Sequence, residues 1–433
     1  MRRFVSLFFT FITAAETFAQ SPAAAVAAVG QPLPAWQPGY LDLHHINTGR
    51  GNAAYYILPD GTTVLFDAGE LDPTDPRTTS RRNTPERPDS SRRPYEWIVD
   101  YIRQFAPGSA KEGIDYAVIS HFHEDHFGGW YPAAPVSADG KFVLSGITGV
   151  GEAIPIHNLL TRDWHYPIDL TAELRRRPAG DHYARSWANY LAFVGDRKAK
   201  GMHTAFLQAG SRTQISLLHD PGKWPGCYVQ NIKSNGWIWT GADSSVRQHF
   251  PPVDTADRKT WPDENPLSNA IVIHYGSFSY YTGGDNPGNV FLGDAPWRDV
   301  ETDIARAVGE VDIATMDHHG NRDALNENFI KTLRPRVWIE QVWTADHPGH
   351  EVLIRATSQL LYPGARDLFA TNFMEANELV IGPLVAQSYK SRQGHILVRV
   401  LPGGREYYVI ILEDGDAGRR VRQVFGPYGA KGK

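Results

Sequence analysis

Four potential metal ligands lie within six consecutive positions of the sequence. They are the imidazoles of His121, His123 and His126 and the carboxylate of Asp125. Side chains two positions apart on an extended segment point the same way, so His121 and His123 can share one ion, while Asp125 and His126 are free to bind a second. Imidazole and carboxylate ligands favour Zn²⁺, with Mn²⁺ or Fe²⁺ as alternatives. The spacing therefore predicts a site for divalent cations rather than a polar loop without metal.

Two later positions offer ligands that can join the same site. Asp285 follows an apolar segment at 278–282, and His318 and His319 follow another at 311–316. A carboxylate at such a strand end can bridge two ions about 3.5–4 Å apart, as two-metal hydrolases require. One histidine of the adjacent pair is predicted to coordinate, and the other to contact substrate or protonate the leaving group. The sequence leaves open which histidine does which.

The elements that must position these ligands are strands. The segment 114–120 is short, apolar and rich in β-branched residues, which indicates a buried strand directly before His121. A hairpin is predicted around Asp60-Gly61, because Asp-Gly supplies the positive φ values of a tight turn, and its second strand ends at Asp67. Helical spacing of apolar residues predicts a helix over 95–105 that packs on the sheet. The remaining predicted strands are 40–46, 269–275, 336–340 and a pair within 395–412, and the remaining predicted helices are 172–176, 185–200, 326–333 and 351–361.

The order of these motifs resembles that of the metallo-β-lactamase-fold hydrolases, from the Asp at a strand end through His-x-His-x-Asp-His and Gly-Asp to a late His. More narrowly it resembles the hydrolase domain of ComEC-type DNA-uptake proteins. The narrower likeness rests on Gly49-Arg-Gly51, Leu267-Ser-Asn-Ala270, Gly284-Asp285 and His318-His-Gly320. The likeness covers roughly residues 40–350, leaves 165–225 unaccounted for, and does not extend to the membrane segments of uptake proteins.

The resemblance implies an α/β fold, a four-layer αββα sandwich, with a two-metal site. It implies that Asp67 lies behind the metals and holds the second N–H of a ligand histidine. The implied ligands are His121, His123, Asp125, His126, Asp285, His318 and His319, and Asp125, Asp285 and His319 form the implied catalytic set. Asn52, Trp130, Asn321 and His347 are expected to contact substrate.

One departure concerns the first ion. Many family members carry a further histidine between the His-rich motif and the Gly-Asp strand. His157, His165 and His347 are the candidates here, although a plain turn ranks slightly above a site role for His347-Pro-Gly-His350. Cys227, the single cysteine, lies far upstream of the ligand strand and is interpreted as core or loop packing.

The composition fits a globular protein with a substantial core. The chain has 433 residues, of which 42% are hydrophobic and 21% charged, and a net charge of −5. A non-specific nucleic-acid binder usually shows a basic excess, so we predict a small-molecule or ester substrate and no nucleic-acid-binding patch.

The N-terminus has the pattern of an export signal. Arg2 and Arg3 precede an apolar run at 4–13, and small residues near Ala19 suit a signal peptidase. We predict a signal peptide at 1–19, a flexible linker at 20–38, a hydrolase domain at 39–412 with an insertion at about 165–225, and a C-terminal tail at 413–433. The location is then periplasmic or secreted, with no membrane span after signal removal, and one cysteine fits such a compartment.

The function predicted from these features is hydrolysis by an exported enzyme with two divalent ions. A metal-bridged hydroxide is expected to attack an ester, with a phosphoester or phosphodiester ranked first. By analogy with the family that the chain resembles, the presence of both His126 and Asp285 implies phosphoester, thioester or lactone hydrolysis rather than β-lactam opening. The alternatives are a β-lactam or lactone hydrolase and a non-catalytic ligand-binding protein on the same fold.

Overall fold

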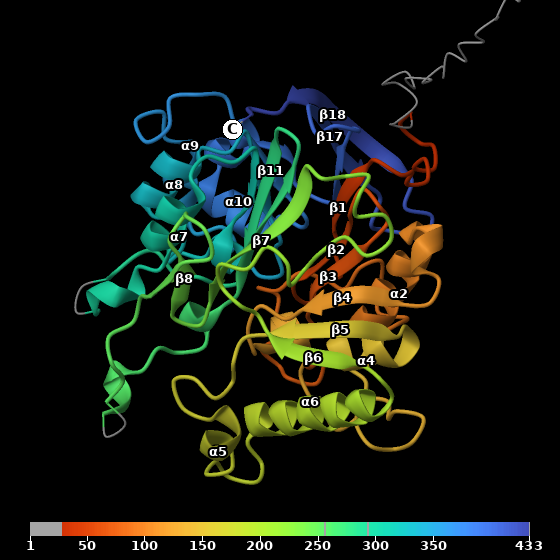
Figure 1. Ribbon diagram of the computed structural model, residues 1–433, viewed down its shortest axis with the longest axis vertical. Coiled ribbons are helices and arrows are strands. Elements are labelled where there is room, and N and C mark those ends of the chain that lie inside the picture. The colour runs from red at the N-terminus through yellow and green to blue at the C-terminus, as the bar shows by residue number, and fades with distance from the viewer. Residues whose placement is uncertain (1–27, 255–256, 292–293, 433) are drawn as a thin grey trace, which may run out of the picture.

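Two nine-stranded β-sheets pack face to face, and helices cover their outer faces (Figure 1). The computed structural model describes residues 28–254, 257–291 and 294–432. The predicted signal peptide at 1–19 and the first part of the predicted linker lie outside these residues. The predicted fold class, a four-layer αββα sandwich, is confirmed.

The first sheet is mixed and has the order β18-β17-β16-β1-β2-β3-β4-β5-β6. Strands β3 to β6 are parallel, and the other neighbours in this sheet are antiparallel. In chain order the strands are β1 Leu41–His45, β2 Ala53–Ile57, β3 Thr63–Ala68, β4 Ile114–Val118, β5 Ile156–Thr161, β6 His203–Phe206, β16 His395–Val400, β17 Glu406–Leu412 and β18 Val421–Gly429.

The second sheet has the order β15-β14-β13-β12-β11-β10-β7-β8-β9. Its strands from β11 to β15 are parallel, and β7 to β10 pair antiparallel. In chain order the strands are β7 Cys227–Ser234, β8 Trp237–Trp239, β9 Val246–Gln248, β10 Ala270–Tyr275, β11 Phe278–Gly283, β12 Ile313–Thr315, β13 Val337–Glu340, β14 Asp367–Ala370 and β15 Tyr389–Ser391.

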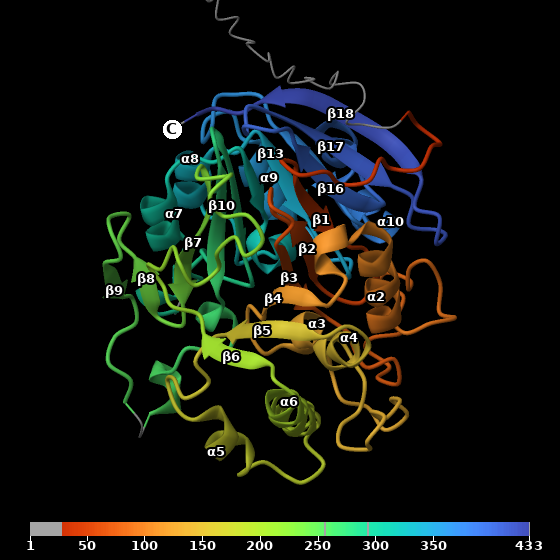
Figure 2. The ribbon, with the colours of Figure 1, turned by 45° about the vertical axis from the view of Figure 1, so that its right-hand side comes forward.

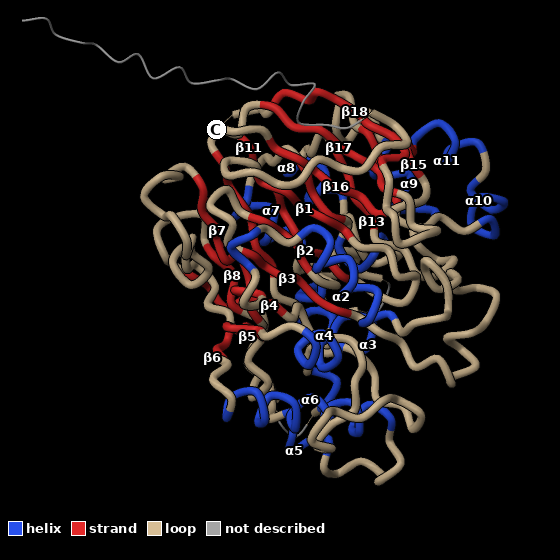
Figure 3. Tube along the Cα trace, turned by 90° about the vertical axis from the view of Figure 1, so that its right-hand side faces the viewer, coloured by secondary structure: helices blue, strands red, loops and turns tan. Residues whose placement is uncertain are grey.

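Helices form the two outer layers (Figures 2 and 3). Those on the side of the first sheet are α2 Pro94–Phe105, α3 Glu124–Phe127, α4 Ile147–Ala153, α5 Leu170–Leu174 and α6 His182–Ala199. Those on the side of the second sheet are α7 Glu301–Val308, α8 Glu327–Leu333, α9 His350–Thr357, α10 Glu375–Ile381 and α11 Pro383–Ser388. Within the described residues, none of the helices combines the length and the hydropathy needed to cross a membrane.

Apolar residues on both faces of the strands explain why both sheets are covered on each side. In β2, Tyr56 belongs to the core between the sheets, and its neighbours Tyr55 and Ile57 belong to the core under the helices. Successive side chains of a strand point to opposite faces, so a strand that is apolar throughout must be buried on both. The hydroxyl groups of Tyr56 and Tyr280 lie 3.0 Å apart and join the two sheets across the inner core.

The chain is more continuous than the predicted domain limits suggest. Residues 421–429, assigned to a tail, form β18, which pairs with β17 at the edge of the first sheet. The predicted insertion at 165–225 supplies α6 and β6, and Trp187, Tyr190 and Phe193 of α6 are buried in the core under the first sheet. These aromatic residues make that segment part of the helical layer rather than a separate appendage.

Candidate metal centre

The predicted ligands lie where the C-terminal ends of parallel strands from both sheets meet. Asp67 is the penultimate residue of β3, and His121 follows β4 in the first sheet. Asp285 follows β11, and His319 lies in the short helical turn Asp317–Gly320 after β12. Ligands of open α/β sheets bind outside the carboxyl ends of the strands, and these residues occupy that position.

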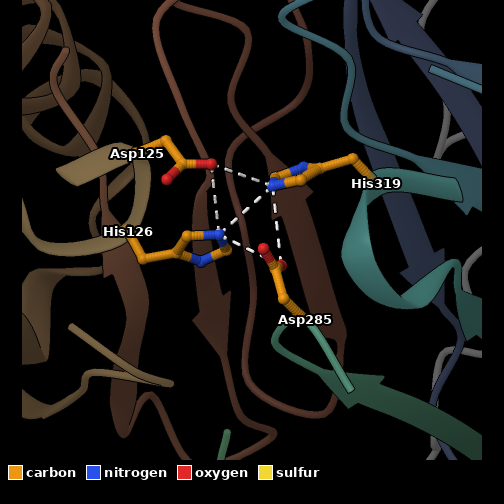
Figure 4. Close-up of side chains that lie close together, drawn as sticks. All are labelled: Asp125, His126, Asp285 and His319. Atoms are coloured by element: carbon orange, nitrogen blue, oxygen red, sulfur yellow. Dashed lines mark hydrogen bonds and ion pairs between the residues drawn. The ribbon is translucent and has the colours of Figure 1, made fainter. Parts of the chain in front are cut away.

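The first cluster of ligand atoms consists of Asp125, His126, Asp285 and His319, all buried. Figure 4 shows the four side chains pointing toward one another, with Asp125 and His126 coming from α3 and Asp285 and His319 from two other segments. His126 Nε2 lies 3.1 Å from Asp285 Oδ1 and 3.1 Å from His319 Nε2. His319 Nε2 lies 3.2 Å from Asp125 Oδ2. One ion can therefore be reached by all four side chains.

The second cluster consists of His121, His123 and the same Asp285. His121 Nε2 lies 3.1 Å from His123 Nδ1 and 3.7 Å from Asp285 Oδ2. Asp285 thus presents Oδ1 to the first cluster and Oδ2 to the second. This is the geometry of a carboxylate that bridges two ions.

The adjacent histidines His318 and His319 point in different directions. Both have positive φ, 46° and 53°, in a region that residues with a Cβ rarely adopt and that is often found at functional sites. His319 belongs to the first cluster, whereas His318 Nε2 lies 3.6 Å from Asp285 Oδ2 and 3.2 Å from the Asn265 amide nitrogen. The His318 side chain is 16% exposed, against 4% for His319.

Oxygen atoms behind the clusters fix the imidazole rings. Asp67 Oδ2 lies 2.9 Å from His126 Nδ1, and the carbonyl oxygen of Gln341 lies 2.8 Å from His319 Nδ1. An N–H donated to each of these acceptors leaves Nε2 with a lone pair that faces the cluster. Asp67 is itself held by Ser120, whose backbone N–H and hydroxyl both donate to it.

Close backbone contacts hold the loop that carries Asp125. The backbone N–H of Asn52 donates to the carbonyl oxygen of Asp125 at 2.7 Å. A Cβ added at Gly69 would lie 1.8 Å from this oxygen, and one added at Gly51 would lie 2.5 Å from it. Only glycine allows the hairpin end to approach the loop so closely.

The charges of the site favour a cation. Burial acts to raise the pKa of Asp285, yet the imidazoles of His126 and His319 hold it well below its usual range. Burial acts to lower the pKa of His126, yet Asp285 and Asp125 raise it well above its usual value. Burial, followed by His126, lowers the pKa of His121, which keeps that imidazole in the neutral form that binds metals.

The donor set fits divalent metal ions. Imidazole nitrogens and carboxylate oxygens converge within 4.8 Å of one another in each cluster. Among the described residues, the ion-pair partners of Asp125 and Asp285 are histidines rather than lysine or arginine. A buried group of carboxylates and imidazoles of this kind is characteristic of ion binding.

The other predicted site residues are placed as follows. His347 is stacked on His319 with ring centroids 4.8 Å apart, and it lies with Asn321 on the wall of a cavity above the clusters. Asn52 donates its side-chain amide to Asp67. Trp130 packs under the guanidinium of Arg185. His157 is exposed on β5, and His165 is paired with Asp163, so neither approaches the two clusters.

The cavity above the clusters, called here the mouth cavity, has a volume of about 700 Å³. It is lined by the ligands themselves and by two loops, 71–83 and 343–347, with Arg77 and Arg82 among the lining residues. Apart from His347, the lining residues of these loops were not predicted from the sequence, because the loops show no motif and meet only through the fold. Asn265, beside His318, was missed for the same reason.

Comparisons with known proteins give distant likenesses. No family model matches the chain. A UPF0282 protein of Pyrobaculum neutrophilum is 29% identical over 169 residues, which are 38% of this chain and 50% of that protein. CmlA, a diiron β-hydroxylase from Streptomyces venezuelae, is 12% identical with a TM-score of 0.35, covering 84% of this chain and 55% of CmlA. Zn²⁺-bound PqqB from Methylobacterium extorquens is 11% identical with a TM-score of 0.26, covering 62% of this chain and 60% of PqqB.

The chain therefore spans about half the length of the first two of these proteins. The narrower likeness to ComEC-type domains stays a prediction. The chain has the four-layer αββα architecture that the resemblance to the metallo-β-lactamase-fold hydrolases implied.

Proposed function

We propose that this protein is a hydrolase that uses two divalent metal ions to cleave an ester, with a phosphoester or phosphodiester as its preferred substrate. The observation that carries the proposal is the position of Asp285. Its Oδ1 lies 3.1 Å from His126 Nε2 in the first cluster, and its Oδ2 lies 3.7 Å from His121 Nε2 in the second. A single carboxylate that serves two ligand sets is what a two-metal hydrolase requires.

The ligand assignment that we propose follows the two clusters. Asp125, His126 and His319 would hold one ion, His121 and His123 would hold the other, and Asp285 would contribute to both sites. When bound, the two cations supply Lewis acidity toward a water nucleophile and toward the oxygens of the ester. Asp67 and the Gln341 carbonyl keep His126 and His319 in the tautomer that binds through Nε2.

We assign His318 to the leaving group rather than to a metal. Its Nδ1 is 2.6 Å from Asp323 Oδ1, which fixes the ring, and its Nε2 is directed toward Asp285 and Asn265 at the wall of the mouth cavity. An imidazole held by a carboxylate and open to the substrate space can hold a proton and deliver it to a departing oxygen.

Two features support a phosphoester over a β-lactam. The ligand set includes both His126 and Asp285, and the mouth cavity carries Arg77 and Arg82. These arginines pair with Asp75 and Asp346 respectively, at 2.6 and 2.9 Å, on the rim of the cavity. A guanidinium in that position can turn to an anionic ester oxygen and bind it through two N–H groups.

The test is a comparison of substrates with the zinc-loaded protein. We expect hydrolysis of bis-p-nitrophenyl phosphate that is lost on chelation, and little or no opening of nitrocefin. His165→Ala, which alters a histidine outside both clusters, serves as the matched control and is expected to keep full activity. Opening of nitrocefin alone would favour the β-lactam alternative, and metal binding without hydrolysis of either substrate would favour a ligand-binding role.

A further inference from the structure

A second cavity of about 600 Å³ lies beside the mouth cavity. We call it the side cavity, and His123 lines both spaces. The short turn at 264–267 stands between them. Glu264 and Leu267 line the side cavity, whereas Asn265 lines the mouth cavity near His318. A substrate held at the second cluster therefore has access to both cavities.

The walls of the side cavity are formed mainly by rings and aliphatic side chains. One wall comes from the segment before and within α5, including Tyr166, Ile168 and Leu170. The opposite wall comes from Trp261 and Leu267, and Tyr183 of α6 closes a third side. Cavities of roughly 300–1,000 Å³ with such walls bind drug-sized molecules chiefly through apolar contact.

The three arginines that line the side cavity are each paired with a carboxylate, and the lysine among its described lining residues, Lys259, is exposed. Arg162 Nε and Nη2 each lie 2.6 Å from an oxygen of Glu264, and Arg298 lies 3.2 Å from Asp263. Arg177 lies 3.4 Å from Asp181 with its guanidinium over the ring of Tyr183. A second anionic group would have to break these pairs, so the cavity is suited to an uncharged ring rather than to a second phosphate.

The Arg162–Glu264 pair also connects the side cavity to the loop 121–126, which carries His121 and His123. Glu264 Oε1 accepts the backbone N–H of Phe122 at 2.8 Å, between His121 and His123. The Arg162 guanidinium lies over the ring of Phe122, 4.9 Å from its centroid. The floor of the cavity is thus fixed relative to the two histidines of the second cluster, and a group bound there is held at a defined position beside them.

We propose that the side cavity binds an uncharged, ring-bearing arm of the ester substrate, attached directly to the group that is hydrolysed. This assignment rests on the proposed function, because it takes the reacting ester to lie at the clusters. The hydroxyl of Tyr183 is buried and makes no hydrogen bond within the described part of the chain. It offers one polar contact to an oxygen or nitrogen of the arm, as specific apolar pockets usually do.

The test compares two phosphonates that are not hydrolysed, 1-naphthyl phosphonate and methyl phosphonate. Their affinities are measured by isothermal titration calorimetry with the zinc-loaded protein, and again with chelator-treated protein. The naphthyl compound is expected to bind the zinc-loaded protein at least tenfold more tightly than the methyl compound. Ile168→Trp fills the cavity, Trp261→Ala removes one wall, and each is expected to reduce the preference to threefold or less.

Trp237→Ala is the matched control, because Trp237 is 46% exposed on β8 and lies outside the lining of both cavities. It is expected to keep the tenfold preference. Absence of a naphthyl preference in the wild type, or the same preference in both cavity variants, overturns the proposal.

The outcomes also separate the two proposals. A naphthyl preference without hydrolysis of any ester keeps the side-cavity assignment and rejects the hydrolase. Zinc-dependent hydrolysis without a naphthyl preference keeps the hydrolase and rejects the side-cavity assignment.

Discussion

At the scale of single residues, the centre depends on how two neighbouring histidines divide their roles. His319 lies inside the first cluster with Nδ1 on a backbone carbonyl, and His318 lies at the cavity wall with Nδ1 on Asp323. The left-handed backbone at both positions turns the two rings apart. The sequence shows only that His318 and His319 are adjacent. Their different positions at the site follow from the folded structure.

The two histidines should therefore respond differently to removal. His319→Ala deletes a ligand and is expected to lose metal and activity together. His318→Ala is expected to keep its metal while the turnover number falls about 100-fold, the lower range for loss of a general acid. Metal content by elemental analysis and kcat on a phosphodiester with an alkoxide leaving group measure the two effects, because an alkoxide needs a proton to depart. Equal metal loss in both variants would contradict the assignment.

At the scale of elements, the β2–β3 hairpin supports the loop 121–126, which carries four of the ligands. The end of β3 reaches the Asp125 carbonyl so closely that Gly69 has no room for a side chain. The next residue, Glu70, donates its backbone N–H to the Glu124 carbonyl, and its buried carboxylate accepts from Arg93 at 2.8 Å. Backbone contacts thus fix the loop to the end of the hairpin. The ion pair between Glu70 and Arg93 fixes the end of the hairpin in turn.

Gly69→Ala tests this support. The added methyl group meets a backbone oxygen that cannot turn away, so the loop must shift, and we expect a loss of about 1–3 kcal/mol in unfolding free energy together with weaker metal binding. Gly195→Ala in α6 is the matched control, because no atom lies within 4 Å of its added Cβ. It is expected to stabilise the protein by up to about 1 kcal/mol through helix propensity. Thermal unfolding with and without zinc distinguishes the two, and an unchanged Gly69→Ala protein would argue against the support.

Elements with strong local signals were predictable from the sequence. The Asp60-Gly61 turn predicted the β2–β3 hairpin, and the apolar run before His121 predicted β4. The segment 413–433 contains charged and glycine residues that interrupt its apolar pattern, so β18 was not predicted. Its backbone pairs with β17 only once the sheet has formed. The Arg162–Glu264 pair joins residues 102 positions apart, and no local sequence pattern predicts such a contact.

At the scale of the whole molecule, the site is a product of the sandwich. The first sheet brings four of the ligands and the second brings Asp285 and His319, and the core between the sheets fixes the distance between the two sets. Burial on this scale also encloses Glu340 at the end of β13, where the Tyr389 hydroxyl donates to its carboxylate. Burial raises the pKa of Glu340 to about 8 from 4.5.

This raised pKa gives the stability a defined pH dependence. Between pH 4.5 and 8 the folded protein holds a proton on Glu340 that the unfolded chain has released, so stability falls as pH rises, by up to about 1.4 kcal/mol per pH unit. Glu340→Gln removes this slope and should be more stable than the wild type at pH 8. Denaturant unfolding from pH 5 to 8 measures the difference, with the exposed Glu327→Gln as control. Parallel curves for wild type and Glu340→Gln would rule out a protonated Glu340.

The most direct measurement is the metal content of the wild type beside Asp285→Ala, after purification in zinc and removal of free ions. With folding of both proteins verified by circular dichroism, we expect about two ions per wild-type chain and a marked loss in the variant, because the bridging carboxylate contributes to both sites. An unchanged metal content in Asp285→Ala would contradict the two-metal centre.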